Sequence, residues 1–217
     1  FHRVGWDDIV QQFKDGSEVF GSTLGMNLYR NANVIILKQF CSDEIVGLYS
    51  AAEKVVKGFQ SVISPAAQAL FPHLSLRFKG KSISENIALL KKISLPFSMV
   101  VVFITIMVFI FAPLIIKILC GDDFVASVPL VRIMTLVILF GEINYLIGIV
   151  GLINMNGQSY FFRSVIVAGV FSVTFVLLLL PHYGVNIAAW AMSLAEILLF
   201  LLCLLSLYRI TKHNGGR

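Results

Sequence analysis

Six apolar segments dominate this sequence, and each is about long enough to cross a bilayer as a helix. They cover residues 18–38, 46–72, 93–119, 128–153, 164–180 and 185–208. The hydrocarbon core of a bilayer is about 30 Å thick, so a spanning helix needs about 20 mainly apolar residues. Charged residues make up only 13% of the chain, about half the share in a typical soluble domain. We therefore predict an all-α, polytopic membrane protein whose residues 18–208 form a six-helix transmembrane bundle.

Basic residues are concentrated in every second connection between these segments. Residues 73–92 contain five Lys or Arg and a single Glu. No Lys or Arg occurs in the alternate connections, residues 39–45, 120–127 and 181–184. The positive-inside rule therefore places residues 73–92 on the cytoplasmic side. With six spans, both ends of the chain are then cytoplasmic, including a tail at residues 209–217.

Turn residues and helix breakers suggest where the helices end. Residues 1–17 form an amphipathic segment that we expect to lie along the membrane surface and to end at Gly16. We expect a hydrophilic connection at residues 73–92 and a loop at residues 154–163, the latter built around an Asn-Gly turn. Pro181 is expected to end the fifth helix, because proline removes a backbone hydrogen-bond donor.

The second apolar segment carries a polar stripe. At about 100° per residue, one side of this helix collects Ser50, Lys54, Lys57, Ser61, Ser64 and Gln68. Charges at membrane depth cost at least about 2.5 kcal/mol each, so they usually face a protein interior or an aqueous cavity. The stripe therefore marks a face that is not exposed to lipid.

The first apolar segment has a matching polar face. Asn27, Arg30 and Asn31 are three and four residues apart, so they lie on one side of a helix. Arg30 precedes the loop at residues 39–45 by nine residues, and Lys54 follows it by nine. In an antiparallel pair both would lie about 14 Å from the loop. We predict that Arg30, Lys54 and Lys57 form one cationic layer.

Several charged residues have two interpretations. Glu53 and Lys57 are four residues apart and could simply pair on the helix, and Lys54 could extend to the interface. Arg132 either lines the cavity or anchors the start of its helix at the interface. Glu142 and Glu196 lie in the middle of apolar segments. Each of the two either binds a coupling proton or cation, or pairs with a basic residue of another helix.

Four strings carry a resemblance to a known family: VFGSTLGMNLYRNANVIIL, VGLYSAAEKVVKGFQSVISPAAQALFPHLS, the GDDF turn followed by Pro-x-x-Arg, and LINMNGQSYFF. These strings resemble the second half of bacterial O-antigen and polysaccharide repeat-unit transporters. This family belongs to the multidrug/oligosaccharidyl-lipid/polysaccharide exporter superfamily. The resemblance implies two six-helix halves around a central cavity in the bacterial inner membrane. This chain would supply one half, with the N-terminal half of the same protein as its partner.

The resemblance also implies a cargo, an oligosaccharide on an undecaprenyl pyrophosphate carrier that is flipped to the periplasmic leaflet. Flipping breaks no bond, so no enzyme activity and no cofactor are expected. Cations suit the pyrophosphate, and amides and hydroxyls suit the sugars. The expected substrate-binding residues are Asn27, Arg30, Asn31, Lys54, Lys57, Ser61, Gln68 and Arg132. The candidates for ion coupling are Glu53, Glu142 and Glu196. A polysaccharide polymerase and a chain-length regulator are further candidate partners.

Other functional classes fit the sequence less well. A drug or cation antiporter of the same superfamily is the first alternative, but it would favour an acidic cavity. A membrane glycosyltransferase or polymerase is the second, but no catalytic constellation is present. The net charge of +5 does not indicate nucleic-acid binding, because the basic residues are divided between connections and membrane segments. The Cys and His residues show no metal-ligand spacing.

Overall fold

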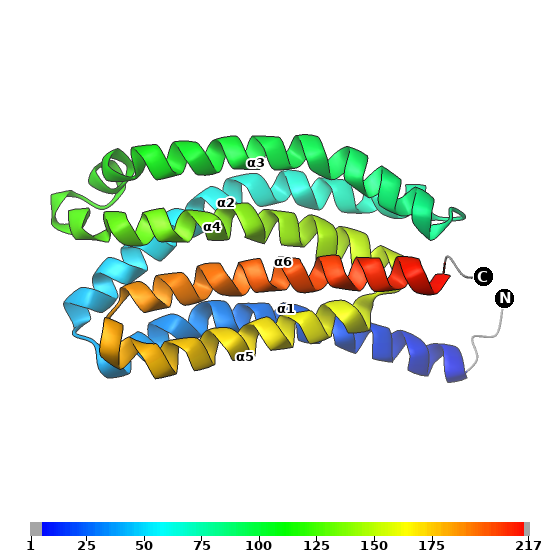
Figure 1. The fold of residues 1–217 in the computed structure, drawn as a ribbon, viewed down its shortest axis with the longest axis horizontal. Coiled ribbons are helices and arrows are strands. Elements are labelled where there is room, and N and C mark those ends of the chain that lie inside the picture. Colours follow the sequence, from blue (N-terminus) through cyan, green and yellow to red (C-terminus); the bar gives the residue numbers. More distant parts are fainter. Residues whose placement is uncertain (1–5, 215–217) are drawn as a thin grey trace.

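The computed structural model describes residues 6–214, which form a bundle of six long helices (Figure 1). The helices are α1 (Trp6–Phe40), α2 (Asp43–Phe78), α3 (Ile83–Leu119), α4 (Val128–Asn144), α5 (Gln158–Tyr183) and α6 (Asn186–Asn214). A 3₁₀-helix, Asp122–Ser127, precedes α4. A π-helical segment, Tyr145–Leu152, and a 3₁₀ turn, Ile153–Met155, continue it. No strand occurs within residues 6–214, and the predicted all-α class is confirmed.

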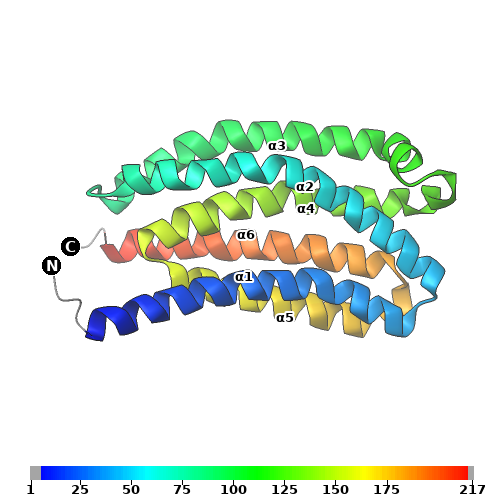
Figure 2. The same ribbon diagram turned by 180° about the vertical axis from the view of Figure 1, so that it is seen from behind.

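The helices do not pack in the order of the sequence. α4 and α6 lie in the middle of the bundle, with α2 and α3 on one side and α1 and α5 on the other (Figure 1). α1 packs mainly on α5, and it contacts its neighbour in sequence, α2, far less. Figure 2 shows α1 and α2 diverging from their shared turn, with α6 visible between them.

The exterior of the bundle is largely apolar. Within residues 6–214, four helical stretches are long and apolar enough to cross a membrane: Ile83–Leu119, Asp122–Met155, Gln158–Tyr183 and Asn186–Lys212. Only 28% of the apolar window of α3 is buried within the bundle, and its outer face includes exposed Met99, Phe103 and Ile110. A helix apolar on its outer face as well as its inner face is typical of contact with lipid. The fold is that of a membrane helix bundle.

The predicted break at Gly16 is wrong, because α1 passes through this residue without interruption. A glycine within a helix costs about 1 kcal/mol relative to alanine, which is too little to end a long helix by itself. The amphipathic segment from residue 6 onward is therefore the first part of α1. The remainder of that predicted segment, residues 1–5, lies outside the described residues.

Four predicted connections are shorter than expected, the first of them reduced from residues 39–45 to residues 41–42. The hydrophilic residues 73–92 are mostly helical, and only residues 79–82 separate α2 from α3. Ser82 and Glu85 explain this, since they form a capping box in which the Ser82 N–H donates to Glu85 Oε2 at 2.8 Å. Polarity there marks the membrane boundary and not the end of a helix.

The fourth and fifth connections show the same effect. The Asn-Gly turn is confirmed, with Asn156 in the left-handed region at φ 57°, but α5 begins at Gln158, well before the predicted residue 164. Pro181 lies inside α5, which ends two residues later at Tyr183. A proline near a helix end removes few hydrogen bonds, so it does not stop the helix at once. α6 likewise continues to Asn214, and the rest of the predicted tail lies outside the described residues.

Gly148 of the π-helical segment packs closely against α5. Among the described glycines that face α5, it leaves the least room for a side chain. A Cβ at this position would overlap the ring of Phe161, so only glycine lets the two helices approach this closely. We expect Gly148→Ala to lower the free energy of unfolding by about 1–3 kcal/mol. Unfolding in detergent micelles, followed by circular dichroism, measures this change. Gly47→Ala is the control, because nothing lies within 4 Å of its Cβ position; equal effects of the two substitutions would contradict the packing argument.

Candidate functional site

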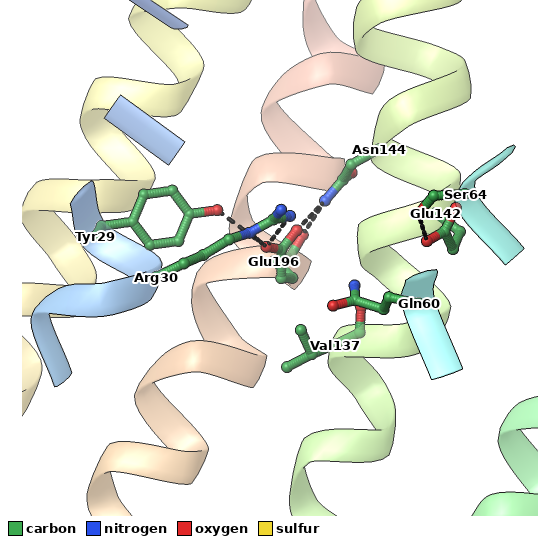
Figure 3. Close-up of polar contacts among 8 residues, drawn as sticks. All are labelled: Tyr29, Arg30, Gln60, Ser64, Val137, Glu142, Asn144 and Glu196. Atoms are coloured by element: carbon green, nitrogen blue, oxygen red, sulfur yellow. Dashed lines mark hydrogen bonds and ion pairs between the residues drawn. The ribbon is translucent and has the colours of Figure 1, made fainter. Parts of the chain in front are cut away.

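A buried carboxylate, Glu196 of α6, is the centre of the polar contacts inside the bundle (Figure 3). Its Oε1 accepts hydrogen bonds from Tyr29 Oη at 3.0 Å and from Arg30 Nε and Nη2 at 2.8 and 2.6 Å. Its Oε2 accepts from Asn144 Nδ2 at 2.9 Å. Both oxygens are therefore hydrogen-bonded, and the charge of Glu196 is matched by Arg30. Of the two roles predicted for Glu196, the structure shows the pairing with another helix.

Small residues allow α1 to reach this position. Tyr29 is buried, and its ring lies against Gly169 of α5, where a Cβ would be 3.3 Å from Tyr29 Cδ1. Arg30 Nη2 lies close to Gly141 of α4, 3.6 Å from the position a Cβ would occupy. The absence of side chains at Gly141 and Gly169 therefore leaves room for the two α1 side chains that bind Glu196.

A second buried carboxylate, Glu142 of α4, lies next to this cluster. Ser64 Oγ of α2 donates to Glu142 Oε1 at 2.7 Å, and Glu142 is 3% exposed. Its Oε2 has no hydrogen-bond partner among the described residues. Gln60 Nε2, one turn earlier on α2, donates to the carbonyl of Val137 at 3.1 Å and lies next to Gly141. The polar cluster therefore extends across α1, α2, α4 and α6, as Figure 3 shows.

A third carboxylate, Glu53, belongs to a contact between α1 and α2. Lys57 Nζ lies 3.0 Å from Glu53 Oε1 on the same helix and donates to Asn31 Oδ1 of α1 at 3.0 Å. Asn31 Nδ2 in turn donates to the carbonyl of Asn27 at 2.6 Å. Lys57 therefore lies level with the residue that follows Arg30, in agreement with the predicted shared depth.

The layer is not purely cationic as predicted. Arg30 and Lys57 are each paired with a carboxylate, and the buried Glu142 adds a third carboxyl group. Unpaired charges are costly at this depth, which explains why the cations occur with acidic partners. Lys54 is exposed. We call this set the polar layer; its members are Tyr29, Arg30, Asn31, Glu53, Lys57, Gln60, Ser64, Glu142, Asn144 and Glu196.

The remaining predicted substrate-binding residues lie in two places. Asn27, Lys54, Ser61 and Gln68 are exposed on α1 and α2. Arg132 does not join the polar layer, since it precedes Glu142 by ten residues on α4, about 15 Å along a helix. Its guanidinium instead lies 5.5 Å from the centre of the Phe109 ring of α3. Arg132 therefore lies outside the polar contacts around Glu196, and its role in substrate binding stays a prediction.

Sequence reasoning missed three members of the polar layer, Tyr29, Gln60 and Asn144. Asn144 did offer a signal, because an amide two residues from Glu142 in an apolar helix needs a partner. Tyr29 and Gln60 offered none, since their sequence neighbours do not show which helix they reach. Within residues 6–214, no three His, Cys, Asp or Glu residues come together in a way that could hold a metal ion.

Comparisons with known proteins agree with the resemblance in the sequence. The model of a family described as "Polysaccharide biosynthesis protein" matches residues 5–77. A curated protein of Escherichia coli (strain K12) is 24% identical over 169 residues, 78% of this chain and 40% of the relative. One of Shigella dysenteriae is 23% identical over 205 residues, 94% of this chain and 50% of the relative. Both are described as "Putative O-antigen transporter".

The chain spans half or less of the length of these curated relatives. No solved structure matches it. The family match covers α1 and nearly all of α2, the two helices that carry the exposed polar side chains and much of the polar layer. The helix bundle and its apolar exterior are those of a membrane protein. Together the matches show that this chain is similar to members of the O-antigen and polysaccharide transporter family.

Proposed function

We propose that this chain forms one half of a flippase for undecaprenyl-pyrophosphate-linked O-antigen or polysaccharide repeat units. In this proposal the transporter lies in the bacterial inner membrane and moves its cargo from the cytoplasmic to the periplasmic leaflet. The start of α1, the turn at residues 79–82 and the end of α6 lie at one end of the bundle (Figure 1), which would face the cytoplasm. In this proposal an N-terminal half of the same protein would supply the opposite wall of the pathway.

The exposed polar side chains of α1 and α2 are the observation that carries this proposal. The other helices expose many large apolar side chains. α1 and α2 also expose amide, ammonium and hydroxyl groups, namely those of Asn27, Asn31, Lys54, Ser61 and Gln68. Such groups are costly against lipid and therefore favour an aqueous cavity or a protein partner. Amides and hydroxyls there would hydrogen-bond sugars, and Lys54 would bind phosphate as a point charge.

The ion pairs suggest how the pathway responds to an anionic cargo. Arg30 and Lys57 are held by Glu196 and Glu53, while their side chains remain 25% and 40% exposed. A pyrophosphate that enters from the exposed side would compete with these carboxylates for the same cations. A change of partner would alter the contacts between α1, α2 and α6, and alternating access requires such a change between helices.

A drug or cation antiporter of the same superfamily is a second candidate. The specific observation in its favour is the composition of the polar layer, where three carboxyl groups accompany two cations. Glu142 Oε2, which lacks a partner among the described residues, is the atom at which a proton or a small cation could bind. The two candidates differ in their cargo, so surface polysaccharide and drug resistance separate them.

We expect the triple variant Lys54→Ala/Ser61→Ala/Gln68→Ala to reduce surface polysaccharide at least about tenfold. Each lost hydrogen bond to a charged group is worth about 1.5–3 kcal/mol, and one such bond corresponds to a factor of ten or more. The measurement is complementation by the full-length protein in cells that lack the transporter, with polysaccharide compared on gels at equal expression.

Lys117→Ala is the matched control, because this exposed cation pairs with Asp122 and lies away from the polar layer. It should complement fully. Normal polysaccharide from the well-expressed triple variant would rule out the proposed face. Loss of drug resistance with normal polysaccharide would instead favour the antiporter.

A further inference from the structure

A groove between α2 and α3 combines an apolar wall with two cations. It has a volume of about 480 Å³, and its apolar lining includes Leu70 of α2 with Ile93 and Phe97 of α3. Arg77 of α2 and Lys92 of α3 line the same groove. The groove therefore offers an apolar surface and a cationic site together, the two features that an anionic lipid needs.

The two cations are available to a ligand. Neither Arg77 nor Lys92 forms an ion pair with an acidic side chain in the described part of the chain. Glu85 is the only acidic residue between residues 73 and 92, and its Oε2 is held by the N–H and Oγ of Ser82, both at 2.8 Å. An anion bound between Arg77 and Lys92 would thus meet no competing carboxylate on these two helix ends.

The groove is separate from the face proposed to bind the cargo. At about 100° per residue, Ala66, Leu70 and Arg77 lie on the side of α2 opposite Lys54 and its stripe. Ala66 and Arg77, both in the groove wall, are eleven residues apart, so the groove extends about 16 Å along α2. This length runs from the level of the basic turn into the apolar part of the bundle.

We propose that this groove is a binding site for one anionic diacyl phospholipid. The phosphodiester lies between Arg77 and Lys92, and the first part of one acyl chain lies against Leu70, Ile93 and Phe97. Basic pockets between membrane helices bind anionic headgroups through this combination of charge and burial. The apolar wall argues against free phosphate, which would gain nothing from it. The proposal is independent of which cargo the transporter carries.

Lipid binding to the purified protein in neutral detergent tests this site. The probes are short-chain phosphatidylglycerol, phosphatidylcholine of the same chain length, inorganic phosphate and undecaprenyl phosphate, and native mass spectrometry gives each Kd. We expect phosphatidylglycerol to bind and to raise the Tm, since a ligand specific for the folded state stabilises it. Phosphatidylcholine should bind at least about tenfold more weakly, because it lacks the net negative charge.

Variants identify the groove. Arg77→Gln/Lys92→Gln should weaken phosphatidylglycerol binding at least about tenfold, and Ala66→Trp, which fills the apolar part, should do the same with both cations intact. Lys79→Ala/Lys81→Ala is the control, because it removes the same charge from the adjoining turn outside the groove; its effect should stay below about twofold.

Four results would overturn the proposal. Equal weakening by the control pair would show diffuse surface attraction, and full affinity in Ala66→Trp would show that the apolar wall is not used. A rise in Tm with inorganic phosphate equal to the rise with phosphatidylglycerol would indicate a site for free anions. Tighter binding of undecaprenyl phosphate, lost in the same variants, would assign the groove to the carrier lipid. The Tm of each variant without ligand shows whether the variant is folded. If Arg77→Gln/Lys92→Gln is not folded, Ala66→Trp still tests the site.

Discussion

Replacing Arg30 by alanine is expected to lower the free energy of unfolding by about 3 kcal/mol, which is a large effect for one residue. The Glu196 side chain is fully buried, so the substitution leaves a carboxylate without its counter-charge inside the bundle. Removing one partner of a buried ion pair typically costs about 3–5 kcal/mol. The lower end applies here, because the Arg30 side chain is 25% exposed and water can partly replace it.

A double variant separates this cause from a simple loss of packing. Arg30→Met/Glu196→Gln removes both charges, keeps an amide oxygen to accept from Tyr29, and should recover most of the stability. Lys117→Ala breaks an exposed pair, with side chains 62% and 74% exposed, and should cost no more than about 1 kcal/mol. Unfolding in mixed detergent micelles, followed by circular dichroism, gives all three values. A double variant as unstable as Arg30→Ala would show that charge burial is not the cause.

Replacing Glu142 by glutamine is expected to abolish the dependence of transport on a proton gradient and to lower transport at least about tenfold. Glutamine keeps the shape of the side chain and can still accept the hydrogen bond from Ser64, but it cannot bind and release a proton. Positioned proton transfer typically contributes a factor of about 10²–10⁴ in enzymes, so a loss of about tenfold is the smallest effect that we expect for a coupling carboxyl group.

The assay uses the full-length protein in liposomes with an imposed pH gradient and a fluorescent lipid-linked oligosaccharide. Glu44→Gln is the matched control, because Glu44 is exposed in the first turn of α2, far from the polar layer. Unchanged Tm in Glu142→Gln would exclude a folding defect. Transport at the wild-type rate, with unchanged dependence on the gradient, would refute the coupling role.

Six helices in this order were predicted from apolar segments, and six long helices are found. Four of the described helical stretches are apolar enough to span a bilayer, and α1 and α2 are not among them. The ends of the helices could not be predicted in this way. The polarity near Gly16 and at residues 73–92 indicates where the chain leaves the hydrocarbon, and not where a helix ends. Backbone hydrogen bonding does not stop at that boundary, so α1, α2 and α3 continue beyond it. Only a local signal such as the Ser82–Glu85 capping box marks a true start.

Several members of the polar layer could be predicted from the sequence, but which residues pair with one another could not. Arg30, Glu142 and Glu196 stand out because ionisable residues are rare in apolar helices. The bond between Arg30 and Glu196 spans 166 residues of sequence, and α6 is apolar around most of its circumference. Its rotation about its own axis, and therefore the partner of Glu196, is set by packing against α4 and α5. No periodicity in one helix contains that information.

Because α1 is one uninterrupted helix, it can tilt as a single rigid rod. At about 1.5 Å per residue, its 35 residues form a rod of about 52 Å, with Arg30 about 36 Å from its start. If α1 tilts about the position of the Arg30–Glu196 pair, a tilt of about 5° moves Trp6 by about 3 Å. Because no loop interrupts the helix between residues 6 and 30, a tilt imposed at its start would rotate the helix at the ion pair by the same angle.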